Sequence, residues 1–286
     1  MTPTFGTRLA AARGALGPLC VGIDPHPSLL EQWGLADDVD GLRRFALTVV
    51  EAVAGVVPAI KPQSAFFERH GSRGVAVLEE VVAAGRSAGT LVVVDAKRGD
   101  IGSTMGAYAD AYLRDGAPLA GDALTVSPYL GFGSLRPAVD LAAATGRGLF
   151  VLALTSNPEG ASVQHARAAD GRSVAAQVAQ EAARLNAAEL AAGGGSLGSV
   201  GLVVGATIGD AAARLGLDLA AVQGPLLAPG VGAQGAGPAE LAAVFGDARS
   251  AVLASSSRGV LSAGPTVDGL RGAAERARDE AAAALA

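Results

Sequence analysis

Leu91-Val92-Val93-Val94-Asp95-Ala96-Lys97-Arg98-Gly99-Asp100 begins with four apolar residues, and four of its last six residues are acidic or basic. A short, continuous, valine-rich run is typical of a strand buried on both faces, as the strands of parallel sheets are. Seven comparable runs occur along the chain, each closed by polar residues, glycine or proline. Together they predict eight strands, at residues 19–24, 59–63, 91–97, 123–127, 149–156, 201–207, 225–230 and 251–256.

Alanine-rich amphipathic stretches lie between these runs and predict helices, most clearly at residues 39–57, 73–88, 173–192 and 238–245. Strands that alternate with helices form parallel βαβ units. Eight such units in 286 residues favour a closed (β/α)8 TIM barrel over an open doubly wound sheet, so we expect residues 1–286 to form a single domain. The longest interval between strands contains the polar residues 157–170, which predict an elaborated loop after strand five.

The composition bounds the class of protein. Half of the residues are apolar and 17% are charged, which is ample material for a large core. The net charge of −5, with the 22 Lys and Arg residues scattered, argues against a general nucleic-acid binder. No apolar stretch approaches the ~20 residues that span a bilayer, and Arg8 and Arg13 interrupt the N-terminus, so we expect a cytoplasmic protein without membrane contact. The single cysteine, Cys20, lies in an apolar run and is expected to be buried.

Charged residues stand at the ends of the first three predicted strands. Asp24 ends the first strand, Lys61 the second, and Asp95 and Lys97 the third. In a TIM barrel the active site forms at the carboxyl ends of the strands, and side chains two apart on a strand share a face. Asp95 and Lys97 then form an acid–base pair beside Lys61. The alternative is a set of rim ion pairs, but buried charges cost several kcal/mol each unless they are paired, so this concentration favours a functional site.

Asp100 follows the third strand, in Arg-Gly-Asp-Ile-Gly-Ser-Thr. It could N-cap a helix that begins near Ser103, although Ser103 itself is the better candidate for that cap. Residue chemistry leaves open whether Asp100 faces the site of its own chain or the site of a neighbour.

Glycine- and serine-rich turns after strands seven and eight predict an anion site. Residues 229–235 precede a helix expected near Pro238, and residues 255–259 follow the last strand. Barrel enzymes often bind phosphate in these two loops, and Arg258 would add a charge-assisted contact. Residues 230–235 also match the dinucleotide pattern Gly-x-Gly-x-x-Gly, but they lie late in the chain and no acidic residue stands about 20 positions on. A simple turn is the remaining alternative.

The three histidines, His26, His70 and His165, are too dispersed to predict a metal site. His26 lies close to the end of the first strand, where a solvated loop residue is the favoured interpretation over a catalytic one.

Asp95, Lys97, Asp100, Ile101 and Thr104 together form the pattern Asp-x-Lys-x-x-Asp-Ile-x-x-Thr. This pattern resembles the signature of orotidine 5′-phosphate decarboxylases. The other segments that resemble the family are Gly22-Ile-Asp-Pro25, Lys61-Pro-Gln-Ser-Ala-Phe-Phe-Glu68, Ser127-Pro-Tyr-Leu-Gly131, Thr155-Ser-Asn-Pro158, residues 229–235 and Ser257-Arg-Gly259. The second and fourth of these are similar to the longer bacterial branch, and the resemblance covers nearly the whole chain.

This resemblance implies a cofactor-free enzyme that converts orotidine 5′-monophosphate to uridine 5′-monophosphate (UMP) and CO2, the last step of de novo pyrimidine biosynthesis. It implies that Lys97 donates a proton to C6, with Asp95 beside the departing carboxylate and with Lys61 and Asp100 in the charged network. Two rivals stay open. One is a sister enzyme of sugar phosphates, which shares Asp-x-Lys-x-x-Asp and needs Mg²⁺, and the other is a barrel that binds a phosphorylated ligand without turnover.

The resemblance also implies a homodimer with active sites at its interface. Asp100, Ile101 and Thr104 would then reach into the site of the partner. The implied substrate contacts are Asp24 on a ribose hydroxyl, Ser156 on the pyrimidine, and Gln234, Arg258 and Gly259 on the phosphate.

Overall fold

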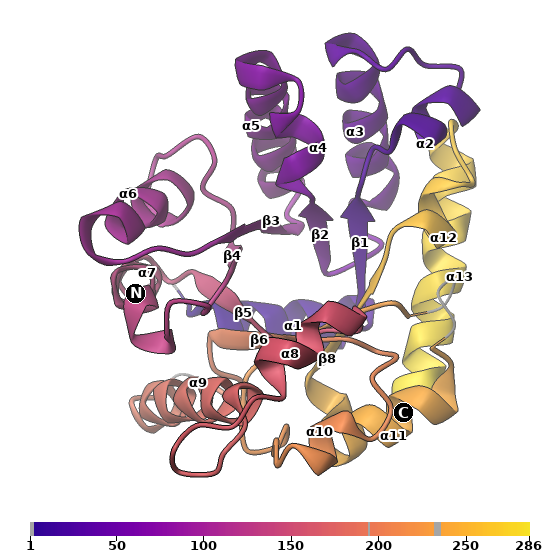
Figure 1. Cartoon of the computed structure of the whole chain (residues 1–286). Coiled ribbons are helices and arrows are strands. Elements are labelled where there is room, and N and C mark those ends of the chain that lie inside the picture. Colours follow the sequence, from indigo (N-terminus) through magenta and orange to yellow (C-terminus); the bar gives the residue numbers. More distant parts are fainter. Residues whose placement is uncertain (1–2, 194, 232–235) are drawn as a thin grey trace.

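Eight parallel strands pair in sequence order and close into a barrel, as predicted (Figure 1). The computed structural model describes residues 3–193, 195–231 and 236–286. Each strand overlaps its predicted run. The strands are β1 (Leu19–Ile23), β2 (Ala59–Pro62), β3 (Leu91–Arg98), β4 (Ala123–Val126), β5 (Gly148–Leu154), β6 (Val200–Val204), β7 (Leu226–Pro229) and β8 (Val252–Ser256).

Helices surround the strands (Figure 1). They are α1 (Phe5–Leu16), α2 (Pro27–Gln32), α3 (Val39–Val53), α4 (Ser64–Glu68), α5 (Gly71–Ser87), α6 (Gly102–Leu113), α7 (Arg136–Thr145), α8 (Ala161–Gln164), α9 (Val174–Ala191), α10 (Ala211–Arg214), α11 (Pro238–Phe245), α12 (Arg258–Leu261) and α13 (Val267–Leu285). The four predicted helices correspond to α3, α5, α9 and α11. The loop after β5 is elaborated, as predicted, and carries the short helices η2 (Pro158–Gly160) and α8. Within the described ranges, no helix is long and apolar enough to cross a bilayer.

The strands bury both faces, because alternate side chains serve two separate cores. On β3, Val92 and Val94 belong to the core between strands and helices, whereas Leu91 and Val93 belong to the core inside the barrel. Every strand contributes at least one side chain to this inner core. Cys20 of β1 is one of them and is fully buried, as expected, and its burial raises the pKa of the thiol to about 12.

Helix α1, which the sequence did not predict, closes the amino-terminal end of the barrel. Its Phe5 and Leu9 are fully buried in the inner core. The Phe5 ring meets Phe150 of β5 edge to face, with 5.9 Å between the ring centroids. Gly148 leaves room for that ring, because a Cβ there would lie 2.1 Å from Phe5. Figure 1 shows α1 crossing behind the strands.

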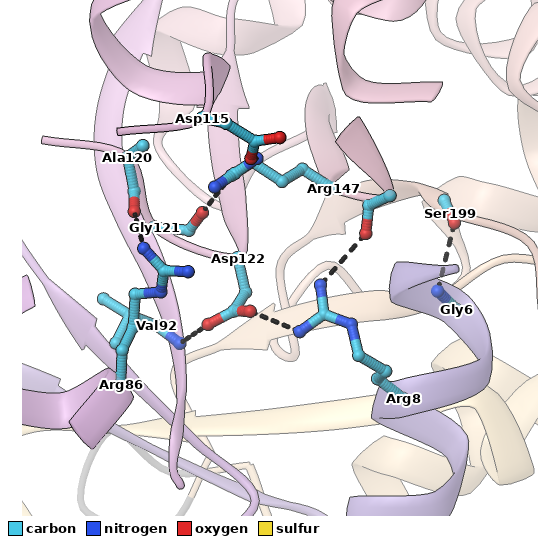
Figure 2. Close-up of polar contacts among 11 residues, drawn as sticks. Gly6, Arg8, Arg86, Val92, Asp115, Ala120, Gly121, Asp122, Arg147 and Ser199 are labelled. Carbon is cyan, nitrogen blue, oxygen red and sulfur yellow. Dashed lines mark hydrogen bonds and ion pairs between the residues drawn. The ribbon is translucent and has the colours of Figure 1, made fainter. Parts of the chain in front are cut away.

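Polar contacts fasten α1 to the starts of the strands (Figure 2). Arg8 forms an ion pair with Asp122, and the other Asp122 oxygen accepts a hydrogen bond from the Val92 N–H at 2.9 Å. The Gly6 N–H donates to the Ser199 hydroxyl at 3.0 Å. This end of the barrel is therefore sealed, which leaves the carboxyl end of the strands for a site.

The capping predictions for Asp100 and Ser103 were wrong. Helix α6 begins at Gly102, its N-cap residue is Ile101, and the cap makes no side-chain hydrogen bond. Ser103 already lies inside the first turn. Asp100 Oδ1 instead accepts a hydrogen bond from the N–H of the next residue, Ile101, at 2.8 Å.

Candidate active site

A cavity of about 320 Å³ opens at the carboxyl ends of the strands. Its volume is in the range of small-molecule sites. Side chains from both ends of the chain line it, because the closed barrel brings β1 beside β8. The site residues predicted from the sequence that line the cavity are Asp24, Lys61, Asp95, Lys97, Ser156, Arg258 and Gly259.

Asp95 is the centre of the charged group. Its Oδ2 lies 2.9 Å from Lys61 Nζ, and its Oδ1 lies 2.6 Å from Lys97 Nζ. Asp95 and Lys61 are buried, with 6% and 5% of their surfaces exposed, whereas 43% of the Lys97 side chain is accessible. The predicted side-by-side arrangement of Asp95 and Lys97 is confirmed. Of the three charged side chains, that of Lys97 is the most accessible to a bound molecule.

The charges stabilise one another in their ionised forms. Burial alone would raise the pKa of Asp95, but the Lys61 and Lys97 ammonium groups and their hydrogen bonds outweigh it and hold the pKa well below its usual range. Burial alone would lower the pKa of Lys61, but the Asp95 and Asp24 carboxylates reverse that effect and raise it. Both groups therefore stay charged across the physiological pH range.

A bulge in β3 presents this pair. Val94 pairs with Leu124 and Arg98 with Val126, so four steps along β3 match two steps along β4. Inside the bulge Lys97 has a φ of 47°, in the left-handed region that residues other than glycine rarely occupy. Strand alternation therefore predicted the correct face for Asp95 and Lys97, although the backbone between them is not a regular strand.

Asp24 has an oxygen available for a ligand. Its Oδ1 is buried and accepts no hydrogen bond from the described part of the chain, and Lys61 Nζ is 3.9 Å away. A buried polar atom without a partner is costly, so it is expected to bind something. Because Asp24 lines the cavity, a hydroxyl of a bound molecule could donate to this oxygen.

The opposite wall of the cavity comes from the ends of β7 and β8. Ser257, Arg258 and Gly259 follow β8, and Arg258 is exposed and makes no ion pair with a described residue. Gly22 of β1 allows Ser257 to pack closely, since a Cβ on Gly22 would lie 2.0 Å from Ser257 Oγ. The predicted contact residue Gln234 lies outside the described residues, as do positions 232, 233 and 235.

A third wall is formed by Thr155, Ser156 and Asn157 after β5. Gln164 of α8 fixes this segment with two hydrogen bonds to Thr155. The Thr155 N–H donates to Gln164 Oε1 at 2.9 Å, and Gln164 Nε2 donates to Thr155 Oγ1 at 2.7 Å. The elaborated loop therefore supports the strand end that carries Ser156.

Asp100, Ile101 and Thr104 do not line the cavity of their own chain. Asp100 is half-buried, and Ile101 and Thr104 are exposed. Ile101 exposes 61% of its surface, and Tyr129 and Leu130, in the loop after β4, expose 76% and 53%. Among the described residues, these are three of the four exposed large apolar side chains, and all three follow neighbouring strands at the same end of the barrel.

The sequence missed several cavity residues. His26 is a half-buried loop residue that lines the cavity, and its ring packs 4.3 Å from that of Phe66. Gln63 also lines the cavity, and alternation could have found it, since it stands two positions after Lys61. In the described part of the chain, no three His, Cys, Asp or Glu side chains are grouped so as to hold a metal ion.

Comparisons with known proteins agree on one family. The profile of the "Orotidine 5'-phosphate decarboxylase / HUMPS family" matches residues 17–272. Orotidine 5'-phosphate decarboxylase from Salinispora tropica is 63% identical over 99% of this chain and 98% of its own, and that from Streptomyces coelicolor is 63% identical over 95% of each. A crystal structure from Streptomyces avermitilis, provisionally given the same name, superposes with a TM-score of 0.93 at 62% identity and covers 99% of this chain and 96% of that one.

Proposed function

The chain belongs to the orotidine 5′-phosphate decarboxylase / HUMPS family, and from this membership we propose that it is a carboxy-lyase that converts orotidine 5′-monophosphate to UMP and CO2. This is the last step of de novo pyrimidine biosynthesis, which we place in the cytoplasm. The observation that carries the proposal is the ion-paired Lys61–Asp95–Lys97 arrangement, with Lys61 and Asp95 buried and Lys97 accessible, in a cavity whose other wall offers Arg258. We further propose that residues 1–286 act as one barrel domain.

The chemistry demands a positioned cation. Loss of CO2 breaks the bond between C6 and the carboxylate and leaves the electron pair on C6, in an sp² orbital that no ring carbonyl readily delocalises. Lys97, whose ammonium is accessible to the cavity, stabilises that charge and then transfers a proton from Nζ to C6. The neutral amine regains its proton from solvent, and no cofactor takes part in these steps.

Asp95 has two roles in this proposal. It orients Lys97 through the contact between Oδ1 and Nζ, and in this proposal it stands beside the position of the substrate carboxylate. Two negative charges at short range raise the free energy of the bound substrate, and departure of neutral CO2 relieves that repulsion. Lys61 keeps Asp95 ionised from the opposite side.

The remaining contacts anchor the nucleotide away from the reacting carbon. We assign the unpartnered Asp24 oxygen to a ribose hydroxyl and Ser156 to the pyrimidine. Gln234, Arg258 and Gly259 are assigned to the phosphate. Binding energy from this remote group can hold the substrate in the reactive geometry.

Lys97→Ala tests the reaction. Loss of orotidine 5′-monophosphate absorbance is followed with EDTA present, and UMP binding is measured by calorimetry. We expect the wild-type chain to turn over without metal and the variant to lose on the order of 10⁴-fold in kcat while still binding UMP. Near-normal turnover by the variant would refute the role of Lys97, and an absolute Mg²⁺ requirement would favour a sugar-phosphate reaction.

We propose in addition that two copies form a dimer in which Asp100, Ile101 and Thr104 complete the site of the partner. Their position outside their own cavity and the exposed apolar side chains around them support this arrangement. It predicts that Lys97→Ala and Asp100→Asn, each inactive alone, recover activity when mixed, because one site of the mixed dimer contains both native residues. Failure of the mixture, with mixed dimers detected by mass spectrometry, would exclude the shared site.

A further inference from the structure

Thr125 lies on β4 directly beside the charged group. Its side chain points into the barrel, only 1% of the residue is exposed, and it is not among the residues that line the cavity. It therefore offers almost no surface to a bound molecule, and we assign its part in the chemistry to its contacts with its neighbours.

The hydroxyl of Thr125 joins two of the groups that matter most. The Lys97 backbone N–H donates to Thr125 Oγ1 at 2.9 Å, and Thr125 Oγ1 lies 2.8 Å from Asp95 Oδ1. A backbone N–H can only donate, and an ionised carboxylate can only accept. The directions are therefore fixed, and the hydroxyl hydrogen of Thr125 is given to Asp95.

The β3 bulge explains why this bond is needed. Between Val94 and Arg98 the regular register with β4 is interrupted, and the Lys97 N–H is bound by the Thr125 side chain. Lys97 also has a φ of 47°, a conformation that is strained for a residue with a side chain and persists only where neighbours enforce it. Thr125 is a neighbour that can enforce it.

Asp95 Oδ1 provides the second link between Thr125 and Lys97. This one oxygen accepts both from Lys97 Nζ, at 2.6 Å, and from Thr125. Thr125 thus holds Lys97 at its backbone and, through Asp95, at its ammonium. Valine has the same shape as threonine but carries no hydroxyl, so it would free the Lys97 backbone N–H and remove one of the two donors to Asp95 Oδ1.

We propose that Thr125 is a positioning residue for the proton-donating Lys97. The inference rests on the proposed decarboxylation. It states that the hydroxyl of Thr125 sets the backbone conformation of Lys97 and the direction of its Nζ toward the reacting carbon, without contributing to nucleotide binding.

The test compares Thr125→Val, Thr125→Ser and a matched control, Thr145→Val. The Thr145 hydroxyl donates to the Leu141 carbonyl within α7 at 2.9 Å, and Thr145 does not line the cavity. The control variant therefore also loses a threonine hydroxyl, but away from the cavity. We expect Thr125→Val to lose on the order of 100-fold in kcat, the effect of a misplacement of about 1 Å, while its Kd for UMP changes less than about 3-fold. Thr125→Ser should recover most of the turnover, and the control should match the wild type.

The outcomes separate the two proposals. If the wild-type chain does not decarboxylate the substrate, the proposed function and this inference fall together. If the wild type is active and Thr125→Val retains kcat within about 3-fold, or loses UMP affinity as much as turnover, only the positioning role is overturned. Should Thr125→Val not fold, Thr125→Ala replaces it in the comparison with Thr125→Ser, and equal kcat values for these two variants would overturn the inference.

Discussion

Lys61→Met removes the cation that lies 2.9 Å from Asp95 and 3.9 Å from Asp24. Methionine keeps the length and apolar stem of the side chain, so the change is chiefly the loss of charge. Breaking a buried ion pair by deleting one partner costs about 3–5 kcal/mol. Lys97 and Thr125 still bind Asp95 Oδ1 in the variant. We therefore expect the lower end, a loss of about 3 kcal/mol in the free energy of unfolding near neutral pH.

The loss should depend on pH with a definite sign. In the wild type the pKa of Asp95 is lowered, so its contribution to stability is complete above the pKa of an unfolded Asp, about 3.9, and declines as the pH falls below that value. Without Lys61 the pKa of Asp95 rises, and the native variant takes up a proton at a higher pH than the native wild type. The difference in stability between the two proteins should therefore shrink as the pH is lowered through the raised pKa of Asp95 in the variant.

Urea unfolding followed by circular dichroism measures this, at one chain concentration and at several pH values, with the variant always compared with the wild type. Arg43→Met is the matched control, because the Arg43–Glu80 pair lies at the surface with about half of each side chain accessible. It should cost less than about 1 kcal/mol at every pH. A Lys61→Met protein as stable as the wild type, or a penalty that grows on acidification, would refute the electrostatic account.

Two further experiments test the burial of Cys20 in the inner core and the position of Arg258 in the cavity wall that follows β8. Cys20 should not react with a disulfide reagent at about pH 8 in the native protein, because burial raises the pKa of its thiol to about 12. In urea the same thiol should react readily. Fast labelling of the native chain would contradict the buried position of Cys20. Gly22→Ala places a Cβ 2.0 Å from Ser257 Oγ and should displace the neighbouring Arg258, so we expect KM to rise on the order of 10-fold. Gly14→Ala, with no atom within 4 Å of its Cβ, should leave KM unchanged, and equal behaviour of the two variants would count against the contact.

The order and spacing of the apolar runs in the sequence were sufficient to predict the barrel architecture. Apolar runs of β-branched residues mark buried parallel strands whatever their environment, so all eight were found. The short helices were not, because α2, α4 and α12 span six, five and four residues, too few for a helical period to show. Helix α1 was missed for another reason. Only Phe5, Gly6 and Leu9 of its residues are buried, which leaves a narrow apolar stripe in an alanine-rich helix.

The residues of the candidate site also differ in whether the sequence could predict them. Charges at strand ends are conspicuous in an apolar chain, so Asp24, Lys61 and Asp95 could be named in advance. Thr125 could not be, because a threonine on a strand is ordinary and its importance depends on the bulge in β3. That bulge is a tertiary feature of the pairing between β3 and β4. The exposure of Ile101 likewise became visible only when the loops were placed in space.

The sealing of the barrel by α1 has a consequence for how the protein is made. Helix α1 leaves the ribosome before every other element, yet the groups that hold it lie far along the chain. The Gly6 N–H binds Ser199, 193 residues later, and Arg13 donates to the Val252 carbonyl at 2.8 Å, 239 residues later. Phe5 and Leu9 therefore have no complete binding place until the last strand has been synthesised. The apolar face of α1 therefore stays without its partners for longer than that of an element whose contacts lie close in the sequence.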